Sequence, residues 1–318
     1  MRRLVIATRG SELALWQARH VREALQRAHP GLEVELKIVH TQGDKVLDVP
    51  LQALDKGMFT REIQVALLEE SADLAVHSLK DLPTEPVEGL ALGAVCTRED
   101  PADALITKGP VTLEALPHGA KVLSGSPRRI AQVLHRRPDV QVLPLRGNIQ
   151  TRLRKFDESD AAAMLLARAG LVRLGLAGRI SARLDPGDFV PACAQGALGV
   201  EIRLADSEVA ALLGPLNDVP VRLAVTAERA FLKALGGGCK IPAGAFARFE
   251  RTTLTIVGMV AALDGARLVK QTLAGEVASA SAAETLGLRL GQAVLQAGGR
   301  EILKAVDSQA SHQQEEEV

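Results

Sequence analysis

Short apolar runs alternate along this chain with stretches in which apolar residues recur at helical spacing. Leu4–Thr8 is one such run and predicts a buried strand. Apolar positions three and four residues apart then predict a helix from a Ser11 cap to about Ala28. Strict alternation over residues 34–38 predicts a half-exposed strand. This β-α-β start predicts a parallel sheet with a right-handed crossover.

The alternation of strands and helices continues to about residue 203, and the pattern then changes. A long helix is predicted over 219–235, followed by strands at 253–260 and 269–274 and a helix over 282–297, which is typical of a smaller α+β domain. We therefore predict an α/β protein in which residues 1–97 and 195–216 form one domain, 98–194 a second and 217–306 a third. The polar end, 307–318, is predicted to be disordered.

Composition narrows the class of protein. No apolar run is long enough for a signal peptide or a membrane span. The 3 cysteines are far apart and odd in number, so neither a disulfide framework nor a zinc motif is indicated, and a reducing cytoplasm is expected. No metal site is predicted, and nothing demands more than a monomer.

Charge is neutral overall but concentrated in the middle of the chain. Residues 121–183 hold thirteen Lys and Arg against four Asp and Glu, a local net charge of +9. Such a segment predicts a polyanionic partner. Single-stranded nucleic acid requires aromatic stacking platforms, and this chain has no Tyr, 1 Trp and 6 Phe. A small molecule with several carboxylates fits the composition better.

The stretch from His77 to Pro83 is the first candidate for chemistry. It follows a short apolar run at 73–76, and its proline ends any regular element. Lys80 and Asp81 are therefore predicted at the carboxyl end of a strand, where ligands bind in open α/β sheets. A lysine beside a carboxylate can hold an anion with one group and face a developing cation with the other. The alternative is a solvated surface ion pair.

Two strand-to-helix junctions add candidates for binding anions. The run Ser124-Gly125-Ser126-Pro127-Arg128-Arg129 predicts a helix start whose free N–H groups, hydroxyls and guanidinium groups attract carboxylates. Arg146, Gly147 and Arg152 repeat this design at the next junction. Ordinary helix starts with solvated arginines are the alternative in both places.

Gly236-Gly237-Gly238-Cys239 ends the long helix predicted in the third domain. Three glycines can carry a cysteine on an unusual backbone, where its thiolate can form a covalent bond. A glycine-capped helix with a structural cysteine is the alternative reading. Cys96, at the end of an apolar run, is predicted to be a core residue, and Cys193 receives no role.

Taken together, these motifs resemble the porphobilinogen deaminase family, also called hydroxymethylbilane synthase, from about Leu4 to Val306. The motifs that carry the resemblance are Ile6-Ala7-Thr8-Arg9-Gly10-Ser11 with Leu13–Gln17, Ala75–Pro83, Leu145–Asn148, Ala169–Leu171 with Arg173–Gly175, Gln195–Ala197 and Gly237–Cys239. Their order and spacing make the resemblance specific, whereas no single motif would.

The resemblance implies a transferase of tetrapyrrole and haem biosynthesis. Two periplasmic-binding-protein-like α/β domains would flank a cleft, and a smaller α+β domain would carry the cysteine. Such an enzyme joins four porphobilinogen molecules head to tail, releases ammonia at each step and frees hydroxymethylbilane by hydrolysis. It works on a dipyrromethane cofactor that it holds through a thioether.

The resemblance also implies roles for individual residues. Asp81 matches the catalytic carboxylate and Cys239 the attachment cysteine. Cofactor-binding positions are matched by Lys80, Ser126, Arg128, Arg129 and Asp44. Substrate-binding positions are matched by Arg9, Gln17, Ser124, Arg146, Arg152, Arg173 and Phe59, the last on a lid. That lid is one residue shorter than in familiar bacterial members, and Ala53 stands where they often have lysine.

Two other classes of protein are compatible with parts of the sequence. A solute-binding or ligand-sensing protein accounts for the first two domains, but it needs neither Cys239 on a glycine loop nor Asp81 beside Lys80. A nucleic-acid-binding protein accounts for the basic segment and predicts steeply salt-dependent affinity for DNA. We expect only weak, nonspecific binding of this kind.

Overall fold

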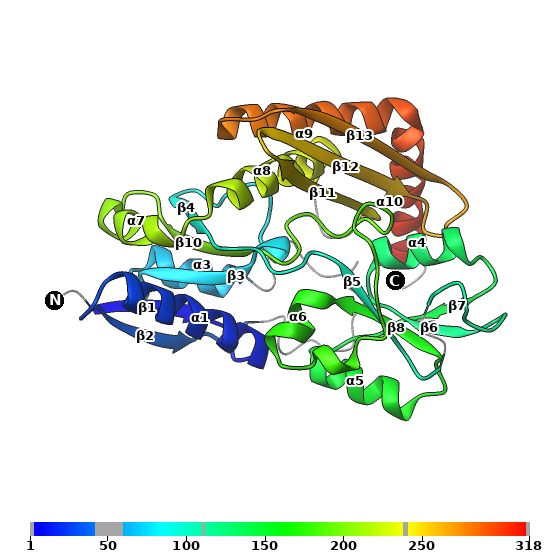
Figure 1. Cartoon of the computed structure of the whole chain (residues 1–318), viewed down its shortest axis with the longest axis horizontal. Coiled ribbons are helices and arrows are strands. Elements are labelled where there is room, and N and C mark those ends of the chain that lie inside the picture. The colour runs from blue at the N-terminus through cyan, green and yellow to red at the C-terminus, as the bar shows by residue number, and fades with distance from the viewer. Residues whose placement is uncertain (1–2, 42–59, 110–111, 238–240, 316–318) are drawn as a thin grey trace.

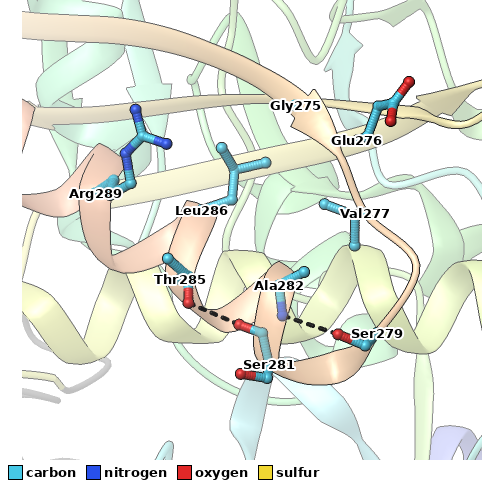
Figure 2. Close-up of a pocket in the computed structure, with 9 residues that line it drawn as sticks. All are labelled: Gly275, Glu276, Val277, Ser279, Ser281, Ala282, Thr285, Leu286 and Arg289. Carbon is cyan, nitrogen blue, oxygen red and sulfur yellow. Dashed lines mark hydrogen bonds between the residues drawn. The ribbon is translucent and has the colours of Figure 1, made fainter.

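The computed structural model describes residues 3–41, 60–109, 112–237 and 241–315. These residues form two five-stranded sheets and one three-stranded sheet, each with its own helices (Figure 1). We call the three assemblies the first, second and third units. In Figure 1 the first unit lies at the left, the second at the lower right and the third above them.

The first unit is built around the predicted β-α-β start. Its strand order is β2-β1-β3-β10-β4, and its strands are β1 (Arg3–Thr8), β2 (Glu33–Ile38), β3 (Leu74–Ser78), β4 (Leu90–Val95) and β10 (Leu198–Arg203). Its helices are α1 (Glu12–Ala28), α3 (Arg61–Leu68) and α7 (Ser207–Leu213), with short 3-10 turns η2 (Leu79–Asp81) and η4 (Gly214–Leu216). Ser11 caps α1 as predicted, since its Oγ accepts from the Ala14 N–H at 3.3 Å. The returning strand predicted within 195–203 is confirmed as β10, which pairs antiparallel with β3 and β4.

The second unit repeats this arrangement with strand order β7-β6-β8-β5-β9. Its strands are β5 (Asp103–Thr107), β6 (Lys121–Leu123), β7 (Gln141–Leu143), β8 (Ala163–Ala167) and β9 (Ala182–Arg183). Its helices are α4 (Pro127–Arg136), α5 (Ile149–Glu158) and α6 (Arg168–Arg173), with the 3-10 turn η3 (Ala177–Arg179). β10 in the first sheet and β5 in the second each run antiparallel to their neighbours. This follows because the chain crosses from one unit to the other twice.

The third unit is the predicted smaller α+β assembly. α8 (Val219–Ala234) and α9 (Ala280–Val294) pack together against β11 (Ala243–Glu250), β12 (Thr253–Ala261) and β13 (Leu268–Glu276). The sequence pattern missed β11, whose alternation is weakened by small residues. On the other face of this sheet, Val257 and Met259 pack with Ala131 of α4 and with Val190. The third unit is therefore fixed to the second through an apolar contact.

The C-terminal helix differs from the prediction. A π-helical segment (Leu295–Gly299) leads into α10 (Arg300–Glu315), anchored by buried Ile302 and Leu303. Residues 307–315, for which the sequence predicts disorder, are helical in the structure as the end of α10. Among the described residues no single helix is long and apolar enough to cross a membrane. Only the pair Ser207–Leu216 and Val219–Ala234, bent by 107°, passes that test when taken together.

Candidate active site

Lys80 and Asp81 lie in η2, directly after β3, as the sequence predicted. Lys80 is half-buried, and its Nζ donates to Gln195 Oε1 at 3.3 Å. Burial lowers the pKa of Lys80 to about 8, although the adjacent Asp81 carboxylate acts in the opposite direction. Asp81 itself is exposed. The pair therefore offers a poorly solvated cation beside an accessible carboxylate.

Gln195 connects this pair to the second unit. Its place follows from the topology, since β10 runs antiparallel to β3 and the Leu79 N–H donates to Ala197 O at 3.0 Å. The Gln195 side chain is fully buried, and its Nε2 donates to Pro101 O at 2.8 Å. Gly196 follows with φ +89°, and a side-chain carbon there would lie 2.2 Å from the Glu99 carbonyl oxygen. Only glycine allows the two crossings of the chain to approach so closely.

Asp103 is a buried carboxylate that accepts hydrogen bonds from Arg128, Arg129 and Gln195. Because β5 is antiparallel to β8, its first residue lies at the sheet edge where α4 begins. Asp103 Oδ2 accepts from Arg128 Nη1 at 2.7 Å, and Oδ1 accepts from Arg129 Nε at 2.9 Å and Gln195 Nε2 at 2.9 Å. Asp103 is fully buried, and despite burial the two guanidinium groups hold its pKa well below the usual range.

The sequence analysis singled out the two arginines but not Asp103 or Gln195 as members of this cluster. The detectable signal for Asp103 is one carboxylate heading an otherwise apolar buried strand. Arg128 is 3% and Arg129 5% exposed, so the reading of these residues as solvated arginines is excluded. Arg128 Nη1 also donates to Val190 O at 2.7 Å, which leaves other guanidinium N–H groups for a ligand.

A second buried ion pair fixes the third unit to both crossings, and the sequence analysis missed it. Arg98 Nη1 and Nη2 donate to Glu228 Oε1 and Oε2 at 2.7 and 3.0 Å, while Arg98 Nε donates to Gln195 O at 2.8 Å. Glu228 is fully buried and also accepts from the Ala194 and Ala247 N–H groups at 2.6 and 2.8 Å. Every oxygen of this carboxylate is thus satisfied, which is what a buried charge requires.

Arg146 lies just before α5, and Arg152 lies in the first turn of this helix, Ile149–Glu158. Asn148 caps the helix by accepting from the Thr151 N–H at 2.8 Å, and Gly147 precedes it with φ +116°. Arg152 Nε donates to Gly147 O at 2.7 Å. Burial, with Arg129 adding repulsion, lowers the pKa of Arg152 to about 10, and Asp81 opposes this. Arg152 of the second unit therefore lies within electrostatic reach of Asp81 in the first.

Two serine hydroxyl groups lie at the start of α4, and the one at the cap position does not form a capping hydrogen bond. Ser126 stands at the N-cap position, but its side chain makes no capping hydrogen bond. Ser124 is 1% exposed and its Oγ accepts from the Ser126 N–H at 3.3 Å. A side-chain carbon at Gly125 would lie 2.4 Å from Leu145 O, so the first and second anion-binding junctions touch.

Three further predicted binding residues belong to, or face, the first unit. Gln17 is buried in α1 and donates from Nε2 to Ser78 Oγ at 2.7 Å. Arg173, at the end of α6, donates from Nη2 to Gly196 O at 2.6 Å, and burial lowers its pKa. Arg9, half-buried, follows β1 at the same sheet edge as Lys80.

The remaining predicted residues, Asp44, Phe59 and Cys239, and the lid residue Ala53, lie outside the described residues. The described segment before Cys239 is nevertheless close to Asp81. Arg229 of α8 donates to Leu82 O at 2.9 Å and Pro83 O at 2.5 Å. A side-chain carbon at Gly237 would lie 3.2 Å from Thr84 Oγ1. At Gly237, two residues before Cys239, the chain therefore lies against the loop that follows Asp81.

Comparisons with known proteins identify the family. Residues 4–211 match the model described as "Porphobilinogen deaminase, dipyromethane cofactor binding domain", and residues 222–296 match "Porphobilinogen deaminase, C-terminal domain". The chain belongs to the porphobilinogen deaminase family. It is 48% identical over 305 residues to a porphobilinogen deaminase of Syntrophotalea carbinolica, covering 96% of both chains. It is 47% identical to one of Chloroherpeton thalassium, covering 94% of this chain and 96% of that one.

Comparison with solved structures gives more distant matches. One is the methionine-binding protein MetQ, with TM-score 0.43 and 12% identity, covering 67% of this chain and 88% of that one. Another is the periplasmic VFT2 domain of Bordetella pertussis BvgS, with TM-score 0.41 and 17% identity, covering 67% and 86%.

Family membership confirms several predictions from the sequence. The protein is an enzyme, a transferase of tetrapyrrole biosynthesis, and its cofactor is dipyrromethane. The predicted fold class is also confirmed by the sheets themselves, with two α/β units and a smaller third unit with an antiparallel sheet.

The cluster around Asp103 suits this deaminase cofactor, which carries several carboxylates. Arg129 lies within electrostatic reach of Lys80, Arg128 and Arg152, and the fully buried Asp103 accepts hydrogen bonds from Arg128 and Arg129. Burial lowers the pKa of Lys80 and Arg152 even though the Asp81 carboxylate opposes this for both groups. Carboxylates placed there would add negative charge that favours the charged forms of these side chains.

The depressed pKa of Lys80 gives the first testable prediction for the deaminase. Burying this cation costs stability below pH 8, and the cost disappears as pH rises towards the unfolded value of 10.5, because the unfolded chain binds more protons there. In cofactor-free protein with Cys239→Ser, Lys80→Met should therefore raise the free energy of unfolding at pH 7, by at most about 3 kcal/mol.

This stability gain should shrink at pH 9.5, and denaturant titrations of both proteins at the two pH values measure it. In the cofactor-loaded enzyme, Lys80→Met should lower stability instead. A destabilised cofactor-free variant at pH 7 would contradict the assignment of Lys80 as a cation whose burial costs stability.

Proposed function

We propose that this enzyme joins four porphobilinogen molecules head to tail into hydroxymethylbilane, with its dipyrromethane cofactor attached to Cys239 and Asp81 as the catalytic carboxylate. The observation that carries the proposal is the contact between the two loops concerned. Arg229 and Gly237 hold the segment before Cys239 against Leu82, Pro83 and Thr84, directly after Asp81.

The cations divide into two groups according to their surroundings. Lys80, Arg128 and Arg129 surround Asp103, and we assign them, with Ser126 and Asp44, to the cofactor carboxylates. We assign the incoming substrate and the growing chain to a second set, which comprises Arg9, Gln17, Ser124, Arg146, Arg152, Arg173 and Phe59. Each porphobilinogen brings an acetate and a propionate, so elongation adds negative charge to a basic surface.

Asp81 is suited to stabilise the charge that develops during the reaction. As the C–N bond of porphobilinogen breaks and ammonia leaves, positive charge develops on the pyrrole nitrogen of the substrate. An accessible carboxylate held beside Lys80 and opposite Arg152 can stabilise that charge. Formation of the C–C bond would require a base to remove a proton from the accepting carbon, and Asp81 is the candidate base on η2. When bound, the dipyrromethane supplies the pyrrole carbon that accepts the first substrate.

The mass of the intact protein tests the attachment. We expect the purified enzyme to be heavier than its chain by two pyrrole units, and Cys239→Ser to have the mass of the chain alone and no turnover. Cys96→Ala is the matched control and should keep the extra mass, because burial raises the pKa of that thiol to about 11 and makes it inert. An active enzyme with the unmodified mass would contradict the proposal.

The finer features of the enzyme belong to the same proposal. We infer a cytoplasmic monomer that acts on a small molecule, without a nucleic-acid or membrane partner. We also infer the division into domains at 1–97 with 195–216, 98–194 and 217–306. The order of the strands supports that division, since β10 returns to the first sheet.

A further inference from the structure

Trp16 lies at the boundary between the first and second units. It is the only tryptophan of the chain, half-buried on α1, and it packs against the core of the first unit. Its ring stacks on His20, with centroids 5.0 Å apart and planes at 9°. The guanidinium carbon of Arg173 lies 5.6 Å from the centroid of the same ring. Trp16 is thus in contact with a cation from the other unit.

Arg173 reaches this ring from α6 of the second unit. It is 9% exposed, and burial lowers its pKa while Glu99 acts in the opposite direction. Its two described contacts, Gly196 O at 2.6 Å and the indole of Trp16, both come from outside the second sheet. Among the described residues, the Arg173 guanidinium donates this one hydrogen bond. A buried guanidinium gains from an aromatic face, which attracts cations most strongly where water is excluded.

The backbone around this contact is shaped for close approach. A side-chain carbon at Gly170, the third residue of α6, would lie 3.6 Å from Leu13 of α1 and 2.6 Å from Ile149. Glu12, at the start of α1, accepts from Gln150 of α5. One residue beyond Trp16, Gln17 donates to Ser78, three residues before Asp81. Residues of the first two turns of α1 therefore contact both units around Asp81.

We propose that Trp16 is a positioning residue, whose indole, backed by His20, holds the Arg173 guanidinium at the boundary of the two units in the orientation that receives a substrate carboxylate. The inference rests on the substrate-binding role of Arg173 in the proposed function. Removing the aromatic face leaves Arg173 one fewer contact and more orientations, so substrate binding weakens while the chemistry at Asp81 is spared.

Steady-state kinetics with porphobilinogen test this role. Trp16→Leu, which keeps apolar bulk but removes the aromatic face, should raise KM about tenfold with kcat changed less than about twofold. Trp16→Phe retains a ring and should stay within about twofold of the natural enzyme. In an Arg173→Met background, Trp16→Leu should have no further effect on KM, because the partner it positions is gone. Equal effects of Trp16→Leu in both backgrounds would overturn the proposal.

Titration of His20 by NMR tests the contact independently of activity. Burial lowers the pKa of His20, and Arg173 and then Arg27 lower it further, while Glu23 raises it. Arg173→Met should therefore raise this pKa, and an unchanged value would overturn the contact itself. If instead the pKa rises but KM of Arg173→Met is unchanged, the substrate role of Arg173 fails and the positioning role of Trp16 fails with it. If Arg173→Met raises KM and Trp16→Leu does not, only the role of Trp16 is wrong.

Discussion

Asp81→Asn should lower the turnover of porphobilinogen by about 10²- to 10⁴-fold, the usual range for losing a positioned acid or base. The amide keeps the size of the carboxylate and one acceptor oxygen, but it replaces the other oxygen with an N–H donor group and carries no negative charge. The cations that hold carboxylates are untouched, so the variant should still carry the mass of the cofactor and still bind substrate. Single-turnover assays and intact-protein mass measure both halves of this prediction.

The control for Asp81→Asn is an exposed carboxylate on the same loop region but outside the cluster. Glu85→Gln meets this requirement and should leave turnover within about twofold, since the charge of an exposed side chain is screened by salt. Asp81→Glu keeps the charge but shifts it by one methylene, and it should retain more activity than the asparagine variant. Comparable turnover in Asp81→Asn and the natural enzyme would refute the catalytic role.

Sequence patterns predicted those features of the fold that are encoded locally. Apolar runs gave the positions of most strands, and helical spacing with Ser11 as a cap gave the start of α1. The return of the chain into the first sheet was predictable because a buried strand followed the second connection. β11 escaped detection because Ala243, Gly244, Ala245 and Ala247 blur its alternation, although pairing with β12 settles its conformation. Tertiary pairing overrides weak local preference in strands.

The residues of the candidate site also fall into two groups, those that a local motif reveals and those that only the fold brings together. Lys80, Arg128 and Arg152 were found because each lies at a strand end or helix start that a short motif reveals. Asp103 and Gln195 are separated by 92 residues, and they meet only because β5 and β10 both run against their neighbours. No local pattern signals that meeting. The same holds for Arg98 and Glu228, which are 130 residues apart.

Asp103→Asn should strongly destabilise the second unit. It removes the only carboxylate that Arg128 and Arg129 contact among the described side chains and leaves two buried cations uncompensated. Breaking a buried ion pair in this way costs about 3–5 kcal/mol. The exposed pair of Lys121 and Asp160, in which the side chains are 41% and 74% exposed, provides the matched control. Asp160→Asn should leave the free energy of unfolding nearly unchanged, because exposed ion pairs contribute little.

The size of the Asp103→Asn effect should depend on the cofactor, and that dependence links the stability of the fold to the function of the site. If cofactor carboxylates bind Arg128 and Arg129, they replace part of the lost negative charge, so the variant should be less destabilised when loaded than in a Cys239→Ser background. Denaturant titrations of the four proteins measure the difference. Because the folded-state pKa of Asp103 is lowered, its contribution is present above about pH 4 and is lost as pH falls, so the penalty should also diminish in acid. An equal penalty with and without cofactor would mean that the two arginines serve only the fold, and that the cofactor carboxylates are held elsewhere.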